Sequence, residues 1–195
     1  MTNVLRAGAL TLAMSALVLA GEWKLDTPHS SAAFAVRHLG VSTVHGAFGK
    51  VTGTASYDPA NPAAASVNVT IDAASVSTRD ENRDKDLRSP NFFDVEKYPT
   101  LTFVSKKVIP EGAGKLQLVG DLTIHGVTKE TVLEVEGPSA PIKDPWGNAR
   151  VGASATTKIN RKDFGITWNK TLDNGGVVVG DEVAIEIEVE LVQAK

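Results

Sequence analysis

The sequence predicts an all-β protein, a closed antiparallel β-barrel of about eight strands. Two observations support this prediction. Apolar and polar residues alternate with a period of two along most of the chain, which is the pattern of strands with one buried face. Turns rich in Gly, Pro, Asn and Asp separate these strands in one continuous series, without a linker. We therefore expect a single domain over residues 21–195.

The clearest alternation lies near the C-terminus. Residues 182–191 place glutamates on one side and branched aliphatic side chains on the other, as a strand with one wet face requires. Further strands are expected at 31–37, 47–57, 67–71, 100–103, 116–124, 133–136 and 150–159. A sheet of this many strands closes or folds over, because open edges invite aggregation.

The alternation does not decide whether the barrel is hollow. Closure at about eight strands leaves an interior just wide enough for side chains or for one small ligand. Several residues of the expected inward face are small, among them Ala33, Gly53, Ala153 and Ala155. Small side chains leave room for a ligand, but a packed barrel also uses them to taper. Both alternatives stay open.

One long connection, about residues 76–99, interrupts the strands and predicts one or two short helices. The segment Thr78-Arg-Asp-Glu81 reads as a capping box, in which Thr78 caps the helix and Glu81 reaches back. Residues 82–88 continue the helix, and Pro90 ends it. Phe92 and Phe93 follow, which places an aromatic pair at the position of a lid over the barrel mouth.

Residues 1–20 predict a secretory signal peptide that is cleaved after about Ala20. They carry one basic residue, Arg6, and then an apolar stretch that ends on small residues. This stretch is shorter than the ~20 apolar residues of a spanning helix, so a stable membrane anchor is the less favoured alternative. In a cell with an outer membrane, the exported protein is expected in the periplasm.

Charge and cysteine content exclude several classes of function. Loss of Arg6 with the signal peptide changes the formal net charge from −3 to −4. A mildly acidic surface argues against nucleic acid, whose phosphates demand clustered Lys and Arg, and against electrostatic attachment to an anionic bilayer. The chain has no cysteine, which excludes thiolate catalysis and Cys-ligated zinc.

The sequence has no motif of an enzyme or of a metal site. It lacks a G-x-S-x-G elbow and an H-E-x-x-H motif. The histidines lie near turns or strand ends and are interpreted as structural, except that His38 is a candidate polar anchor near the cavity mouth. We therefore expect no catalytic residue, no metal and no cofactor.

Several motifs follow one another along residues 22–193. They include Trp23-Lys-Leu-Asp-Thr-Pro-His-Ser30, Phe34-Ala-Val-Arg-His38, Val44-His-Gly-Ala-Phe48, Phe92-Phe-Asp94, Tyr98-Pro-Thr-Leu-Thr-Phe103 and Arg161-Lys-Asp-Phe-Gly165. In this order and spacing they are specific, and the chain resembles the YceI-like family of exported polyisoprenoid-binding proteins. The resemblance implies a lipocalin-like barrel with an elongated apolar cavity. It also implies a long-chain isoprenoid or fatty amphiphile as ligand, such as a quinone or prenyl phosphate, and homodimers.

The candidate ligand-binding residues are large apolar side chains together with one histidine and one arginine. They are Phe34, His38, Phe48, Arg83, Leu87, Phe92, Phe93, Leu101, Phe103, Leu122, Phe164 and Trp168. For each apolar member, an ordinary core position is at least as good an interpretation. For Arg83, which belongs to an Arg-Asp pair of the family motif, the alternatives are a contact with a polar head group and a solvated ion pair.

Three functions are compatible with these observations. The first is an exported lipid-binding protein for transport, storage or sequestration, which needs a vacant apolar interior. The second is an enzyme acting on such a lipid, which needs polar groups inside the barrel, such as His38 with Arg83. The third is an interaction module with a filled core and an exposed apolar patch.

Overall fold

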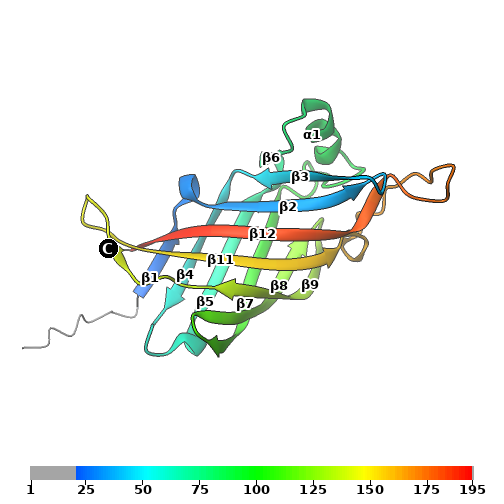
Figure 1. The fold of residues 1–195 in the computed structure, drawn as a ribbon. Coiled ribbons are helices and arrows are strands. Elements are labelled where there is room, and N and C mark those ends of the chain that lie inside the picture. Colours follow the sequence, from blue (N-terminus) through cyan, green and yellow to red (C-terminus); the bar gives the residue numbers. More distant parts are fainter. Residues whose placement is uncertain (1–20, 195) are drawn as a thin grey trace, which may run out of the picture.

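The computed structural model describes residues 21–194 as an antiparallel β-barrel with a short helix at one end (Figure 1). The expected signal peptide lies outside the described residues. The strands are β1 (Gly21–Leu25), β2 (Ser31–His38), β3 (Ser42–Phe48), β4 (Val51–Tyr57), β5 (Ser66–Asp72), β6 (Val76–Ser77), β7 (Thr100–Gly112), β8 (Lys115–Ile124), β9 (Val127–Glu136), β10 (Ile142–Lys143), β11 (Ala149–Asn160) and β12 (Val179–Gln193). The helix is α1 (Glu81–Arg88). Among these residues, no helix combines the length and the apolar composition needed to cross a bilayer.

The strands close into a ring of eight. Going around the wall, β1 pairs with β4, and β5, β7, β8, β9 and β11 follow in order. The last strand, β12, then pairs with β11 on one side and with β1 on the other. All of these pairs are antiparallel. The prediction of a closed antiparallel barrel of about eight strands is confirmed.

Three strands of the wall are interrupted and then continue. Strands β2, β3 and β6 extend β1, β4 and β5 toward the α1 end, beyond short breaks that include residues 26–30, 49–50 and 73–75. The breaks lie side by side, because Thr27 donates a hydrogen bond to the Val51 carbonyl and the Gly49 amide donates to Ser75. The wall therefore bends along one line while its strands stay paired on either side.

The wall is least continuous between β9 and β11. These strands share three residue pairs, from Ser154–Glu136 to Thr156–Glu134. By contrast, β11 pairs with β12 along its whole length from Arg150 to Asn160. Toward the α1 end, the short 3₁₀ helix η4 (Arg161–Phe164) contacts β9.

The long connection contains α1, as predicted, but its cap differs from the prediction. Asp80 is the N-cap residue, and its carboxylate accepts a hydrogen bond from the Arg83 amide at 3.0 Å. Arg79 has a φ of 63°, which turns the chain so that Thr78 lies beside the helix. The amide and hydroxyl of Thr78 donate to the buried carboxylate of Asp84, at 2.7 and 2.6 Å. The predicted capping box is therefore wrong, because a left-handed residue separates Thr78 from the helix start.

Asp84 stabilises the connection in a pH-dependent way. Burial by itself would raise the pKa of Asp84, but the hydrogen bonds from Thr78 and the charge of Arg88 hold it below the ordinary value. Because the folded-state pKa is lowered, this stabilisation is present above the ordinary carboxyl pKa of ~3.9 and is lost as the pH falls below it.

We predict that Asp84→Ala lowers the free energy of unfolding at pH 7 by about 2 kcal/mol, because two donors of Thr78 lose their acceptor. Denaturant titrations at pH 7 and pH 3 measure this, and the loss should be smaller at pH 3. Glu81→Ala, an exposed position of the same helix, is the control and should cost no more than ~1 kcal/mol. Equal losses for Asp84→Ala at both pH values would contradict the assignment.

Candidate functional site

The interior of the barrel is hollow. A cavity of about 280 Å³ extends along it, and its volume lies just below the ~300–1,000 Å³ range of small-molecule sites. Tyr57, Leu116 and Pro138 line it near the chain's N-terminal end, and Leu87 and Ile166 line it near α1. The alternative of a filled barrel is therefore wrong for the described residues.

Inward-facing residues of β12 show how the hollow affects packing. Val183, Ile185, Ile187 and Val189 all line the cavity and are all only half-buried. In a packed barrel such inward positions would be fully buried, since side chains from the opposite wall would cover them. Their remaining exposed surface faces the cavity.

Two glycines keep aromatic rings against the wall. A Cβ atom on Gly120 would lie 2.5 Å from Cζ of Phe103, and one on Gly46 would lie 2.4 Å from Cζ of Phe34. Each ring therefore occupies the space that a side chain on the facing strand would fill. Both phenylalanines line the cavity, so the missing side chains leave more of its centre empty.

Arg161 is the charged residue of the lining, and its hydrogen bonds are used within the protein. It is 4% exposed. Its guanidinium donates to the carbonyls of residues 166, 168, 179 and 180 and to the carboxylate of Asp181, at 2.7–3.3 Å. A guanidinium has five N–H donors, so these contacts occupy its full capacity. Burial lowers the pKa of Arg161. Arg161, which directly follows β11, thus ties residues 166–168 to the first residues of β12.

The remaining polar lining consists of hydroxyl side chains, and everything else is apolar. The hydroxyl residues are Thr54, Ser56, Tyr57, Thr102, Ser154 and Thr157. The described lining contains no carboxylate or histidine, which are the usual general acids and bases. The chemistry of the cavity therefore suits the shelter of apolar groups.

The structure brings most of the predicted site residues into the lining. They are Phe34, Phe48, Leu87, Phe92, Phe93, Leu101, Phe103, Leu122 and Phe164. Near α1, the rings of Phe48 and Phe93 meet edge to face at 5.4 Å between centroids. That these residues contact a ligand stays a prediction.

Three predicted residues do not line the cavity. Trp168 packs against Phe92, with ring centroids 5.4 Å apart, and so lies behind the lining. His38 ends β2, where it pairs with Ser42 and Val179. Arg83 donates to the Thr78 hydroxyl and carbonyl at 2.7 and 3.0 Å, which fixes its side chain beside the start of α1. The polar pair of His38 and Arg83 is therefore not present inside the barrel.

Sequence reasoning missed most of the aliphatic part of the lining. Residues such as Val67, Val69, Ile71 and Ile124 and the inward face of β12 line the cavity. Period-two alternation had already placed several of them on an inward face. Nothing in the alternation distinguishes a residue that faces a cavity from one that packs against another side chain.

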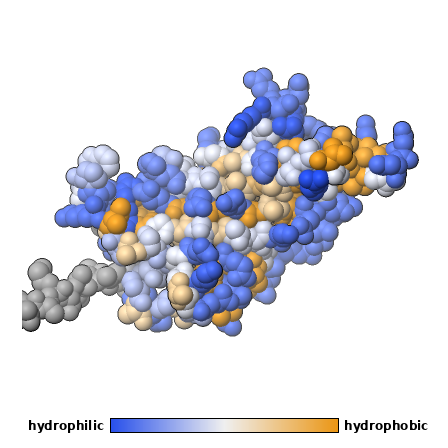
Figure 2. Space-filling view, viewed as in Figure 1, coloured by the Kyte–Doolittle hydropathy of each residue, from blue (hydrophilic) through white to orange (hydrophobic). Residues whose placement is uncertain are grey.

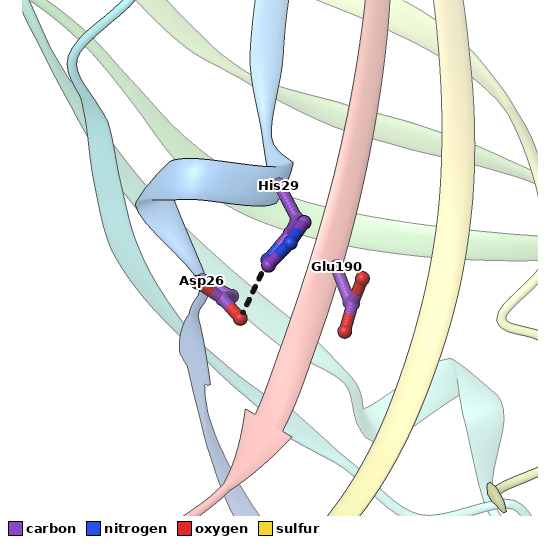
Figure 3. Close-up of side chains that lie close together, drawn as sticks. All are labelled: Asp26, His29 and Glu190. Carbon is purple, nitrogen blue, oxygen red and sulfur yellow. Dashed lines mark hydrogen bonds and ion pairs between the residues drawn. The ribbon is translucent and has the colours of Figure 1, made fainter. Parts of the chain in front are cut away.

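A separate polar cluster lies on the outside of the barrel, between η1 (Thr27–His29) and β12 (Figure 3). Asp26, His29 and Glu190 place their ligand atoms within 4.8 Å of one another. However, a guanidinium nitrogen of Arg150 bonds to both Asp26 and Glu190, and its Nε donates to Asp144 at 2.8 Å. The hydrogen bond from Arg150 lowers the pKa of Asp26 and of Asp144. An arginine thus occupies the position that a metal ion would need.

The closed wall and the apolar hollow define a class of protein, the antiparallel β-barrel with an internal cavity for an apolar guest. The YceI-like domain family matches residues 23–191, and the chain belongs to this family.

Curated relatives and solved structures agree with this family assignment. A UPF0312 protein of Vibrio cholerae is 46% identical over 149 residues, covering 75% of this chain and 78% of the relative. The Campylobacter jejuni YCEI protein is 30% identical with a TM-score of 0.68, and the match covers 98% of this chain and all of the other. A polyisoprenoid binding domain from Saccharophagus degradans shares the fold with a TM-score of 0.64 at 17% identity, over 88% of this chain and 98% of that domain.

We predict that Gly46→Ala reduces the cavity and costs about 1–3 kcal/mol of unfolding free energy, as overpacking does. The new methyl group would overlap the Phe34 ring and the Thr78 methyl group, so these side chains must shift. Gly49→Ala is the matched control, because its Cβ meets no atom within 4 Å.

Denaturant titrations of both variants and of Gly46→Ala combined with Phe34→Leu measure the effect. The double variant should recover part of the loss. No recovery would show that the contact with Thr78, and not the Phe34 ring, accounts for the loss.

Proposed function

We propose that this protein binds a long-chain isoprenoid of the quinone or prenyl phosphate type, or a similar amphiphile, inside its barrel and does not alter it chemically. The observation that carries the proposal is the hollow interior, which is lined by apolar side chains from the whole circumference of the wall. The binding serves transport, storage or sequestration of the lipid.

The energetics of an apolar tail support this function. Each methylene group moved from water into an apolar site gains ~0.8 kcal/mol, so ten isoprenoid carbons gain about 8 kcal/mol. The cavity needs no specific polar contact to obtain this gain. A volume of about 280 Å³ accommodates part of a long chain, and the head group then lies toward solvent.

The family supports the same ligand class. The Saccharophagus degradans domain that shares this fold is described as polyisoprenoid binding. The lining of the present cavity, with hydroxyl groups and a fully hydrogen-bonded arginine, favours binding over an enzymatic reaction. No observation on the described residues favours the enzyme alternative specifically.

The proposal includes export and a homodimer. Residues 1–20 have the charge and apolar pattern of a signal peptide, which supports a periplasmic location in a cell with an outer membrane. The homodimer rests on resemblance to the family.

The direct test is to purify the full chain from its own host and to extract it with organic solvent. Mass spectrometry of the extract should identify a long-chain lipid near one molecule per protein. The same lipid, recovered unchanged after incubation, supports binding. A chemically altered lipid supports an enzyme, and a protein that yields no lipid and excludes apolar dyes contradicts the proposal.

We predict that Phe92→Ala and Phe103→Ala each weaken lipid retention about tenfold, because each removes a ring from the lining. Val104→Ala is the matched control for Phe103, since it is the next residue of β7 and is exposed on the outer wall. Competition against a fluorescent apolar dye measures retention. Unchanged retention in both phenylalanine variants, with the fold intact, would remove these residues from the site.

A further inference from the structure

Exposed apolar side chains gather at the α1 end of the barrel. Val41 is 78% exposed, and Leu39 and Val177 are 38% and 42% exposed. Figure 2 shows apolar surface near this end, where β2, β3 and the loop before β12 meet in Figure 1. We call the turn 39–41 together with Val177 the apical tip.

The apical tip has a well-defined backbone. Leu39 and Gly40 have φ angles of 53° and 71°, and the Leu39 amide donates to the Val178 carbonyl at 2.8 Å. Arg37 donates to the Gly40 carbonyl at 2.6 Å and to the Thr43 hydroxyl at 3.0 Å. The turn is therefore held by internal hydrogen bonds while Val41 points out of it. A fixed, exposed apolar side chain of this kind commonly marks an interaction site.

The apical tip adjoins two cavity-lining residues along the chain. Val36 and Val179 both line the cavity. In β2, Val36 lies three residues before Leu39, and Val179 lies two residues after Val177. The pairing of His38 with Val179 holds the two segments side by side. The apical tip therefore lies within three residues of the cavity lining on both of its segments.

The two segments of the apical tip carry a net charge of one positive unit, with His38 neutral. Arg37 and Lys170 are exposed, and among residues 21–194 neither has a carboxylate within ion-pair distance. The segments 37–43 and 169–178 contain one acidic residue, Asp173. The net negative charge of the chain does not cancel this local excess, because salt screens charges beyond about 8–10 Å.

We infer that the apical tip docks on the surface of an anionic phospholipid bilayer and that lipid passes there between the bilayer and the cavity. Partly inserted apolar side chains with basic residues beside them are the features by which proteins bind such surfaces. The inference rests on the proposed function, since the bilayer is where a long-chain lipid resides.

A second exposed apolar pair provides a comparison. Trp146 and Ile142 are 78% and 64% exposed, in the loop between β9 and β11 at the opposite end of the barrel. Neither residue lines the cavity. In that loop Pro138 lines the cavity and Lys143 is exposed, so Trp146→Ser is the competing variant in the test.

The test is flotation of the lipid-free protein with vesicles of phosphatidylethanolamine and phosphatidylglycerol, and with vesicles of phosphatidylcholine alone. We expect Val41→Ser to weaken binding about tenfold on both kinds of vesicle. Lys170→Gln should weaken it about fivefold, and only where phosphatidylglycerol is present. Val132→Ser, a 40% exposed valine on the outer wall, is the matched control and should bind like the unchanged protein.

Three results would overturn the inference. In the first, Val41→Ser binds vesicles as well as the control does. In the second, only Trp146→Ser loses binding. In the third, the protein binds no vesicles but self-associates, and Val41→Ser abolishes this self-association. The first two exclude the apical tip as the docking site, and the third replaces the bilayer with a second copy of the chain.

A second measurement separates this inference from the proposed function. Transfer of a fluorescent prenyl lipid from vesicles should be slower in Val41→Ser, while the amount bound at equilibrium stays unchanged. Unchanged transfer rates with normal lipid binding would overturn the docking and leave the proposed function intact. Vesicle binding by a protein that takes up no lipid would contradict the proposed function itself.

Discussion

Closure of the hydrogen-bonded wall is the constraint on which the rest of the structure depends. Strand β12 pairs with β11 on one side and with β1 and β2 on the other, so the wall has no long free edge there. Backbone groups are then satisfied within the wall whatever occupies its centre. An empty apolar interior loses dispersion contacts. Two packed apolar clusters offset part of that loss, one around Phe48 and Phe164 near α1 and one around Trp23 at the other end.

The fold was predictable because its pattern is local and repeated. The glutamates of 182–191 determine which face of β12 is wet, and the ladder with β11 follows that register from Asn160 to Arg150. The interruption at 76–99 also produced a helix at the expected place, with its end just before Pro90. Each of these features depends on neighbours in sequence.

The candidate site was only partly predictable, because its decisive features join distant residues. The sequence alone cannot show that the Phe34 ring lies over Gly46. Nor can it show that the N–H donors of Arg161 hydrogen-bond to the segment 166–181. The left-handed backbone at Arg79 likewise accompanies hydrogen bonds from Thr78 to the buried carboxylate of Asp84, so that Thr78 is a partner of the helix and not its cap. Whether the centre of the barrel is vacant depends on all such contacts together.

The hydrogen bonds of Arg161 have a consequence for the stability of the α1 end of the barrel. One planar group holds acceptors spread over residues 166–181, and no lysine has the geometry to replace it. Loss of any one of these acceptors would leave a buried N–H donor unsatisfied. A single side chain thereby makes residues 166–168 and the first residues of β12 depend on each other for their stability.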